Sequence, residues 1–165
     1  MIILFCGLPG VGKTTLANEV SGLINAVVLS SDKIRKELIP KPTYRPEEKK
    51  LIYDIFILVA KYLHEAGVNC ILDATFNKEV FRNRVKKSLR LSAKEFCIVE
   101  CVCPENIVIS RLNKRKAGFS DADISVYRMM KKIFDPVHEP HIVADTSGSP
   151  KEVAKIVSRQ FRNIK

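Results

Sequence analysis

The fold of this chain follows from residues 7–14, which read Gly7-Leu8-Pro9-Gly10-Val11-Gly12-Lys13-Thr14. An apolar run, residues 2–6, precedes this loop. A helical pattern follows it, with one apolar face formed by Leu16, Val20, Leu23 and Ile24. A glycine-rich loop between a strand and a helix that opens with Lys-Thr is the Walker A arrangement in its required context. The sequence therefore predicts a site for a nucleoside triphosphate; the simpler alternative is a glycine-rich turn that only links strand to helix.

The residue types of the loop match this chemistry. Glycines permit a tight turn and a close backbone approach to phosphate oxygens, and the N–H groups of the loop and of the helix N-terminus face the anion. We expect Lys13 to reach the outer phosphates and the Thr14 hydroxyl to coordinate Mg²⁺. Nucleotide contacts are predicted for Gly7, Gly10, Val11, Gly12, Lys13, Thr14 and Thr15. ATP is favoured over GTP because the sequence has no Asn/Thr-Lys-x-Asp motif that reads guanine.

Length and composition bound the class of protein. With 165 residues, the chain is expected to form a single domain over residues 1–165 with a sizeable core. No apolar run approaches the roughly 20 residues that span a bilayer, so we expect a cytoplasmic protein with no membrane partner. The five cysteines lie mostly in apolar runs without metal or redox spacing, and we interpret them as buried, reduced thiols.

The formal net charge is +10, which favours a polyanionic partner such as RNA or DNA. Between positions 78 and 90 lie six basic residues: Lys78, Arg82, Arg84, Lys86, Lys87 and Arg90. The alternative is a solvated helix face, with the positive charge serving ATP and solubility alone. The net charge is compatible with both interpretations. The sequence does not determine the oligomeric state.

Further strands are predicted at 26–30, 68–73, 95–102 and 141–145, each followed by a helical pattern. One of the helices, 47–66, is expected to bury the apolar stripe Leu51, Ile55, Leu58, Val59, Tyr62 and Leu63. Alternation of strands and helices predicts an α/β fold with a parallel sheet that is covered on both faces. Ligands bind such sheets beyond the carboxyl ends of the strands, so the polar residues there should converge near the glycine-rich loop.

Two of these strand ends carry carboxylates. Asp32, after the second strand, is predicted to accept the proton of an acceptor hydroxyl and orient it for in-line attack. Arg35, one helical turn further on, is predicted to hold an acceptor phosphate or the transferring group. Asp73, after the third strand, is predicted to hold Mg²⁺ through water or to bind the acceptor beside Thr75. The alternatives are helix-capping aspartates and a solvated arginine.

Arginines complete the candidate site. One of Arg82 and Arg84 is expected to face the site, and Arg82 is assigned to the substrate. Arg111 and Arg115 have i, i+4 spacing, which places both on one helix face ahead of a hinge-like stretch. This pattern predicts a lid over residues 111–121 that brings positive charge over the phosphates and excludes water. The alternative is a basic helix face in solvent.

Taken together in their order along the chain, the motifs described above resemble those of a group of small P-loop kinases. This group includes polynucleotide 5′-hydroxyl kinases, seryl-tRNA(Sec) kinase, chloramphenicol phosphotransferase and zeta toxins. The resemblance rests on Gly-Leu-Pro-Gly-Val-Gly-Lys-Thr-Thr, Ser-Ser-Asp-Lys-Ile-Arg, Ile-Leu-Asp-Ala-Thr-Phe with Arg82 and Arg84, and Arg111-x-x-x-Arg115. It implies a three-layer α-β-α sandwich with strand order 2-3-1-4-5 and a short helical lid. It also implies Asp32 as the acceptor-activating carboxylate, and an adenine site between a lid arginine and the loop around Ser147.

Three functional hypotheses follow. The leading one is an ATP- and Mg²⁺-dependent kinase that transfers the γ-phosphate to a hydroxyl, with a nucleic-acid or nucleotide-like acceptor favoured. The second is a kinase for a nucleoside, antibiotic or metabolite, and the third is a nucleotide-dependent RNA-binding switch or slow ATPase. The acceptor loop, residues 41–46, carries no signature that separates them. Its Tyr44 either stacks on a base or packs on Phe76 or Phe81.

Overall fold

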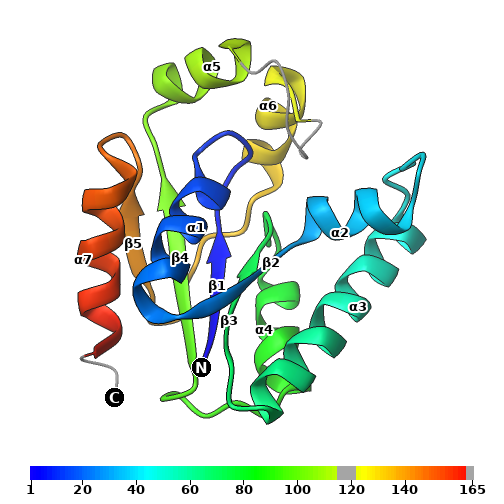
Figure 1. Cartoon of the computed structure of the whole chain (residues 1–165). Coiled ribbons are helices and arrows are strands. Elements are labelled where there is room, and N and C mark those ends of the chain that lie inside the picture. Colours follow the sequence, from blue (N-terminus) through cyan, green and yellow to red (C-terminus); the bar gives the residue numbers. More distant parts are fainter. Residues whose placement is uncertain (115–121, 163–165) are drawn as a thin grey trace.

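The computed structural model describes residues 1–114 and 122–162 (Figure 1). Within them, five parallel strands form one sheet in the order β2-β3-β1-β4-β5. The strands are β1 Ile2–Cys6, β2 Ala26–Ser30, β3 Asn69–Asp73, β4 Phe96–Val102 and β5 Ile142–Asp145. The central strand β1 pairs with β3 on one side and with β4 on the other. The α/β class and the strand order 2-3-1-4-5 are confirmed.

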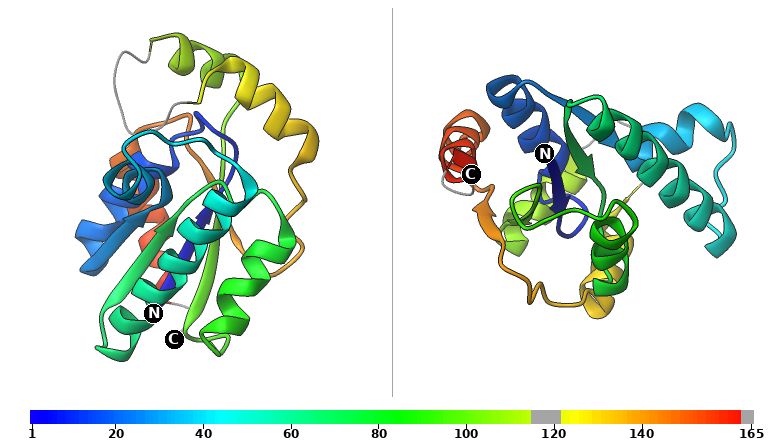
Figure 2. Two further views of the ribbon diagram at one scale, coloured as in Figure 1. Left: turned by 90° about the vertical axis from the view of Figure 1, so that its right-hand side faces the viewer. Right: turned by 90° about the horizontal axis from the view of Figure 1, so that it is seen from below.

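Helices cover both faces of the sheet and so give three layers (Figures 1 and 2). They are α1 Lys13–Ile24, α2 Ser31–Leu38, α3 Pro46–Glu65, α4 Glu79–Ser88, α5 Glu105–Lys114, α6 Ile124–Ile133 and α7 Pro150–Arg162. Helices α1 and α7 pack on one face, and α3 and α4 on the other. Helix α2 follows directly from the end of β2, and α5 and α6 lie beyond the carboxyl ends of the strands (Figure 1). No helix of the described residues is long and apolar enough to cross a bilayer.

The core is divided by the sheet into two clusters. Every residue of β1 is fully buried, and successive side chains enter opposite clusters, as the two-residue period of a strand requires. Ile3 and Phe5 pack toward α1 and α7, whereas Ile2 and Leu4 pack toward α3 and α4. Burial on both faces explains why this strand reads as a continuous apolar run.

Helix α3 buries a different stripe from the predicted one. Its buried residues are Ile52, Phe56 and Ala60. Of the predicted stripe, Leu51, Leu58 and Tyr62 are more than half exposed. The prediction was wrong because aromatic packing sets the rotation of the helix: the rings of Tyr53, Phe56, Phe76 and Phe81 form one cluster between α3, α4 and the sheet.

Candidate active site

The loop between β1 and α1, residues 7–12, has the backbone geometry of a phosphate site. Gly7, Gly10 and Gly12 have φ angles of 136°, 80° and 100°, a region that side chains with a Cβ rarely adopt. Gly12 is the N-cap of α1, and within the described residues no side chain caps this helix and no acidic residue occupies its first turn. The first N–H groups of α1 are therefore available to an anion.

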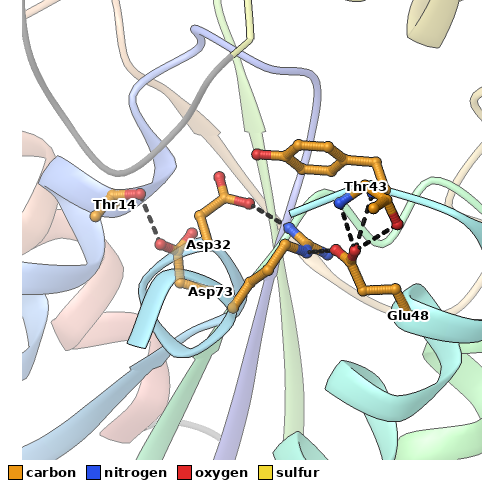
Figure 3. A network of polar contacts seen from close by, with 7 residues as sticks. Thr14, Asp32, Thr43, Glu48 and Asp73 are labelled. Carbon is orange, nitrogen blue, oxygen red and sulfur yellow. Dashed lines mark hydrogen bonds and ion pairs between the residues drawn. The ribbon is translucent and has the colours of Figure 1, made fainter. Parts of the chain in front are cut away.

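Two side chains of the first turn of α1 face the end of the sheet. Lys13 is buried, and its Nζ donates to the carbonyl of Leu8 at 2.9 Å. Thr14 Oγ1 donates to Asp73 Oδ2 at 2.6 Å, which joins α1 to the end of β3 (Figure 3). Burial raises the pKa of Asp73, while the Lys13 charge and the Thr14 hydrogen bond act in the opposite direction.

The Thr14–Asp73 pair suits a magnesium ion. Hydroxyl and carboxylate oxygens are the donors that Mg²⁺ prefers, and in nucleotide sites the ion takes only one or two of them and fills its shell with phosphate oxygens and water. Within residues 1–114 and 122–162, no group of three or more His, Cys, Asp or Glu side chains gathers as a metal site.

Asp32 and Arg35, both in α2, lie next to the Thr14–Asp73 pair. The Asp32 side chain is 38% exposed, and Figure 3 shows it between the Thr14–Asp73 pair and Glu48. Arg35 Nη1 donates to Asp32 Oδ1 at 3.0 Å, and the arginine side chain is only 7% exposed. Arg35 Nε also lies 3.0 Å from Glu48 Oε1. Arg35 is therefore a buried, paired cation and not a solvated surface arginine.

Glu48, in the first turn of α3, is the main residue of this region that the sequence analysis missed. Its Oε2 accepts hydrogen bonds from Thr43 N at 2.6 Å, Thr43 Oγ1 at 2.8 Å and Tyr44 N at 3.1 Å. Burial alone would raise the pKa of Glu48, but these bonds and the Arg35 charge lower it. A capping-box glutamate at this third helical position would bind the N-cap N–H, but Glu48 binds the N–H groups of the two residues before the N-cap, Arg45. The sequence lacks the Ser or Thr N-cap that would have signalled this contact.

The structure brings neither Arg82 nor Arg84 to the site. Arg82 is 0% exposed, and it donates through Nη1 to the carbonyl of Phe76 at 2.9 Å and through Nη2 to the carbonyl of Pro136 at 2.7 Å. Arg84 pairs with Asp54 of α3. Arg82 therefore joins α4 to two loops, whereas the sequence analysis assigned it to the substrate. The backbone of Thr75 contacts the glycine-rich loop, because its carbonyl oxygen accepts a hydrogen bond from the Gly7 N–H at 3.2 Å.

Arg111 connects the glycine-rich loop to the end of β5. Its Nη1 donates to the Val11 carbonyl at 3.1 Å and its Nη2 to the Thr146 carbonyl at 2.6 Å. Beside this contact lies a pocket of about 310 Å³, lined by Gly10, Gly12, Thr15, Leu16, Arg111, Thr146, Pro150 and Val153. Ser147, the predicted adenine contact, is exposed, and its N–H donates to Asp145 at 2.8 Å. Arg115 and the rest of the predicted lid, 115–121, lie outside the described residues.

These features define a P-loop nucleotide-binding fold with the strand order of the small P-loop kinases. Residues 2–137 match the family model described as AAA domain, and the chain belongs to this family. Among curated proteins, the uncharacterized protein Rv2004c of Mycobacterium tuberculosis and the uncharacterized protein Mb2027c of Mycobacterium bovis are each 25% identical over 137 residues. The match covers 76% of this chain, and the chain spans only 28% of the length of these relatives.

Solved structures show the same fold. A sugar kinase from Janibacter sp. HTCC2649 has a TM-score of 0.77 at 16% identity, over 99% of this chain and 94% of that one. The Mycobacterium tuberculosis APS kinase CysC, in complex with AMPPNP and APS, has 0.75 at 19% identity, over 98% and 96%. Kti12 of Chaetomium thermophilum, in complex with ADP-AlF3, has 0.75 at 14% identity, over 99% and 98%. The resemblance to small P-loop kinases is confirmed, and at these identities the likeness concerns the fold.

Proposed function

We propose that the protein is an ATP- and Mg²⁺-dependent phosphotransferase that moves the γ-phosphate of ATP to a hydroxyl of an acceptor. The observation that carries this proposal is the position of Asp32, a carboxylate that is 38% exposed and that Figure 3 shows beside the Thr14–Asp73 pair. A nucleotide held by the glycine-rich loop would place its outer phosphates between the Thr14–Asp73 pair and Asp32. A carboxylate on that side serves an acceptor hydroxyl.

We assign each residue a role that fits its contacts. Asp32 accepts the proton of the acceptor hydroxyl and orients its oxygen for in-line attack. Lys13 and the N–H groups of the loop bind the phosphates, and the pocket that Arg111 lines beside the loop takes the adenine. Thr14 and Asp73 would hold Mg²⁺, which when bound neutralises charge on the phosphate oxygens. Arg35 takes a positioning role, because it is already bonded to Asp32.

The acceptor is a separate question. A nucleic-acid or nucleotide-like acceptor, as in polynucleotide kinases, is supported by the net charge of +10. The contacts of α4 reduce that support, since Lys78 pairs with Asp135, Arg82 is enclosed and Arg84 pairs with Asp54. A small-molecule acceptor is the second candidate. It is favoured by an acceptor side in which Arg35 is matched by the two carboxylates Asp32 and Glu48.

The test of the proposed function is phosphate transfer from γ-labelled ATP to a panel of 5′-hydroxyl RNA and DNA, tRNA, nucleosides and small alcohols. A labelled product that requires Mg²⁺ supports the proposal. Affinity for a polynucleotide acceptor should fall steeply as salt rises, whereas binding of a neutral small acceptor should not. If no acceptor is labelled while ATP is slowly hydrolysed, the chain is a nucleotide-dependent switch or slow ATPase instead.

The Asp32→Asn variant tests the assigned base on the acceptor found in this way. We expect transfer to fall by about 10²–10⁴-fold, because general base catalysis contributes about that much, with ATP affinity nearly unchanged. Glu37→Gln, on the exposed face of the same helix, is the matched control. Near-normal turnover of the Asp32 variant would show that another group serves the hydroxyl.

A further inference from the structure

The carboxylate of Glu48 fastens the acceptor loop, residues 41–46, to α3. Glu48 accepts three hydrogen bonds from Thr43 and Tyr44 through one oxygen, and its other oxygen lies against Arg35 Nε. The same side chain therefore sets the position of the loop and of the arginine that is bonded to Asp32. Figure 3 shows this junction of Thr43 and Glu48 next to Asp32.

Tyr44 is held by this junction in an unusual conformation. Its φ angle is 58°, a left-handed value that is uncommon for a residue with a bulky side chain, and its N–H is bound by Glu48. The Arg35 guanidinium lies over the Tyr44 ring, 4.8 Å from its centroid, in the range of a cation–π contact. The residue is 37% exposed, so a ring fixed by its backbone and by Arg35 still presents surface to solvent.

Tyr44 is not a core aromatic residue. The sequence analysis left open that it packs on Phe76 or Phe81, but Tyr53 of α3 occupies that place. The Tyr53 ring stacks on Phe81 at 5.2 Å and meets Phe76 edge-on at 5.3 Å. The contact of Tyr44 with Arg35 instead places its ring beside the arginine that orients Asp32.

We propose that Tyr44 is the specificity-determining platform of the acceptor site, that Glu48 positions it, and that the acceptor carries its hydroxyl on a ring. This inference rests on the proposed function and names its substrate class: a nucleoside or a cyclic sugar, free or at the end of a polynucleotide. A rigid aromatic face stacks on a nucleobase or packs against the C–H face of a sugar ring, so it favours ring-bearing acceptors over open-chain ones. Asp32 and Glu48 neutralise the charge of Arg35. The acceptor ring that stacks on Tyr44 beside this arginine therefore needs no charged group.

The test uses three probes and two variants. Cytidine and D-ribose carry rings, and ribitol is the open-chain counterpart of ribose. With ATP and Mg²⁺, the ring-bearing probes should be phosphorylated with a lower KM than ribitol. Tyr44→Leu should raise their KM by about tenfold, the scale expected for loss of one stacked ring, whereas Tyr44→Phe keeps the ring and the wild-type KM. Equal use of ribitol and ribose, or a Tyr44→Leu variant with unchanged KM, overturns the proposal.

The positioning role of Glu48 has its own control. Glu48→Gln keeps an acceptor for the loop N–H groups but loses the charge that faces Arg35. We expect its KM for cytidine to rise and its KM for ATP to stay constant, while Glu47→Gln, at the exposed neighbouring position, behaves as wild type. A Glu48→Gln variant with an unchanged KM for cytidine contradicts the positioning role.

Failure of the platform and failure of the kinase function can be told apart by binding without turnover. Isothermal titration with the same probes in the presence of AMPPNP measures the platform alone. Binding of cytidine or ribose that weakens in Tyr44→Leu, without any phosphate transfer, keeps the platform and refutes the kinase. No binding of either ring-bearing probe refutes the platform. A 5′-hydroxyl oligonucleotide that binds more tightly than cytidine, and more weakly as salt rises, assigns the ring to a polynucleotide end.

Discussion

Replacing Gly7 by alanine should destabilise the protein strongly, because two separate effects act at this position. The φ angle of 136° lies where a Cβ is strained, at a cost of about 1–3 kcal/mol. A Cβ on Gly7 would also lie 2.4 Å from the carbonyl oxygen of Cys101, a backbone atom near the carboxyl end of β4. Such overpacking costs about 1–3 kcal/mol. Together we expect a loss of about 2–6 kcal/mol in the free energy of unfolding.

Gly22→Ala is the matched control within the same strand–loop–helix unit. Gly22 lies in α1, and a Cβ there meets nothing within 4 Å. Alanine should therefore stabilise the helix by about 0.5–1 kcal/mol. Urea unfolding followed by far-ultraviolet circular dichroism measures both variants, with equal m-values as the check on two-state behaviour. If Gly7→Ala unfolds at the same urea concentration as Gly22→Ala, the steric reasoning is refuted.

Three more predictions concern buried groups. Arg82→Met should lower the free energy of unfolding by about 2–6 kcal/mol, because the carbonyls of Phe76 and Pro136 lose their donors. Urea unfolding of this variant and of the exposed control Lys86→Met measures the loss. Equal losses in the two variants would contradict the prediction. Asp73→Asn should weaken Mg²⁺-dependent ATP binding by about 10–100-fold. Titration of ATP with and without EDTA measures this change. An unchanged Mg²⁺ dependence would show that Asp73 is not part of the metal site. Burial raises the pKa of Cys6 and of Cys70 from 9.0 to about 12. As pH rises, the unfolded chain therefore loses these thiol protons at a lower pH than the folded protein does. The free energy of unfolding should then fall as pH rises from about 9 toward 12, by about 1.4 kcal/mol per pH unit for each thiol. Equal free energies of unfolding from urea melts at about pH 8 and about pH 10 would refute this prediction.

The parts of the site that the sequence predicts well are encoded locally. The glycine spacing and the Lys-Thr pair depend on neighbouring residues alone, and the positive φ angles at Gly7, Gly10 and Gly12 have the backbone form that the motif requires. The carboxylates after β2 and β3 were found by a rule of topology, since parallel strands end at one edge. That rule brought Asp32 and Asp73 to the same region without any knowledge of their contacts.

The arginines were predicted less well, because residue type and spacing do not say which way a long side chain turns. Arg82 and Arg84 are two positions apart on α4, and both find partners within the fold: carbonyl groups for Arg82 and Asp54 for Arg84. Arg35 was expected to face the acceptor or the moving phosphate. It is enclosed between Asp32 and Glu48, a partner 13 positions along the chain.

Taken alone, the sequence determined the glycine-rich loop, the α/β class and the carboxylates at the ends of β2 and β3. These follow from short-range patterns, in which glycine conformations and apolar periodicity act within a few residues. The tertiary structure decided the rotation of α3, the burial of Arg82 and the junction of Glu48 with the loop that carries Tyr44. Those features depend on packing between elements far apart in the chain, where charge pairing and steric fit choose among partners that the sequence leaves equivalent.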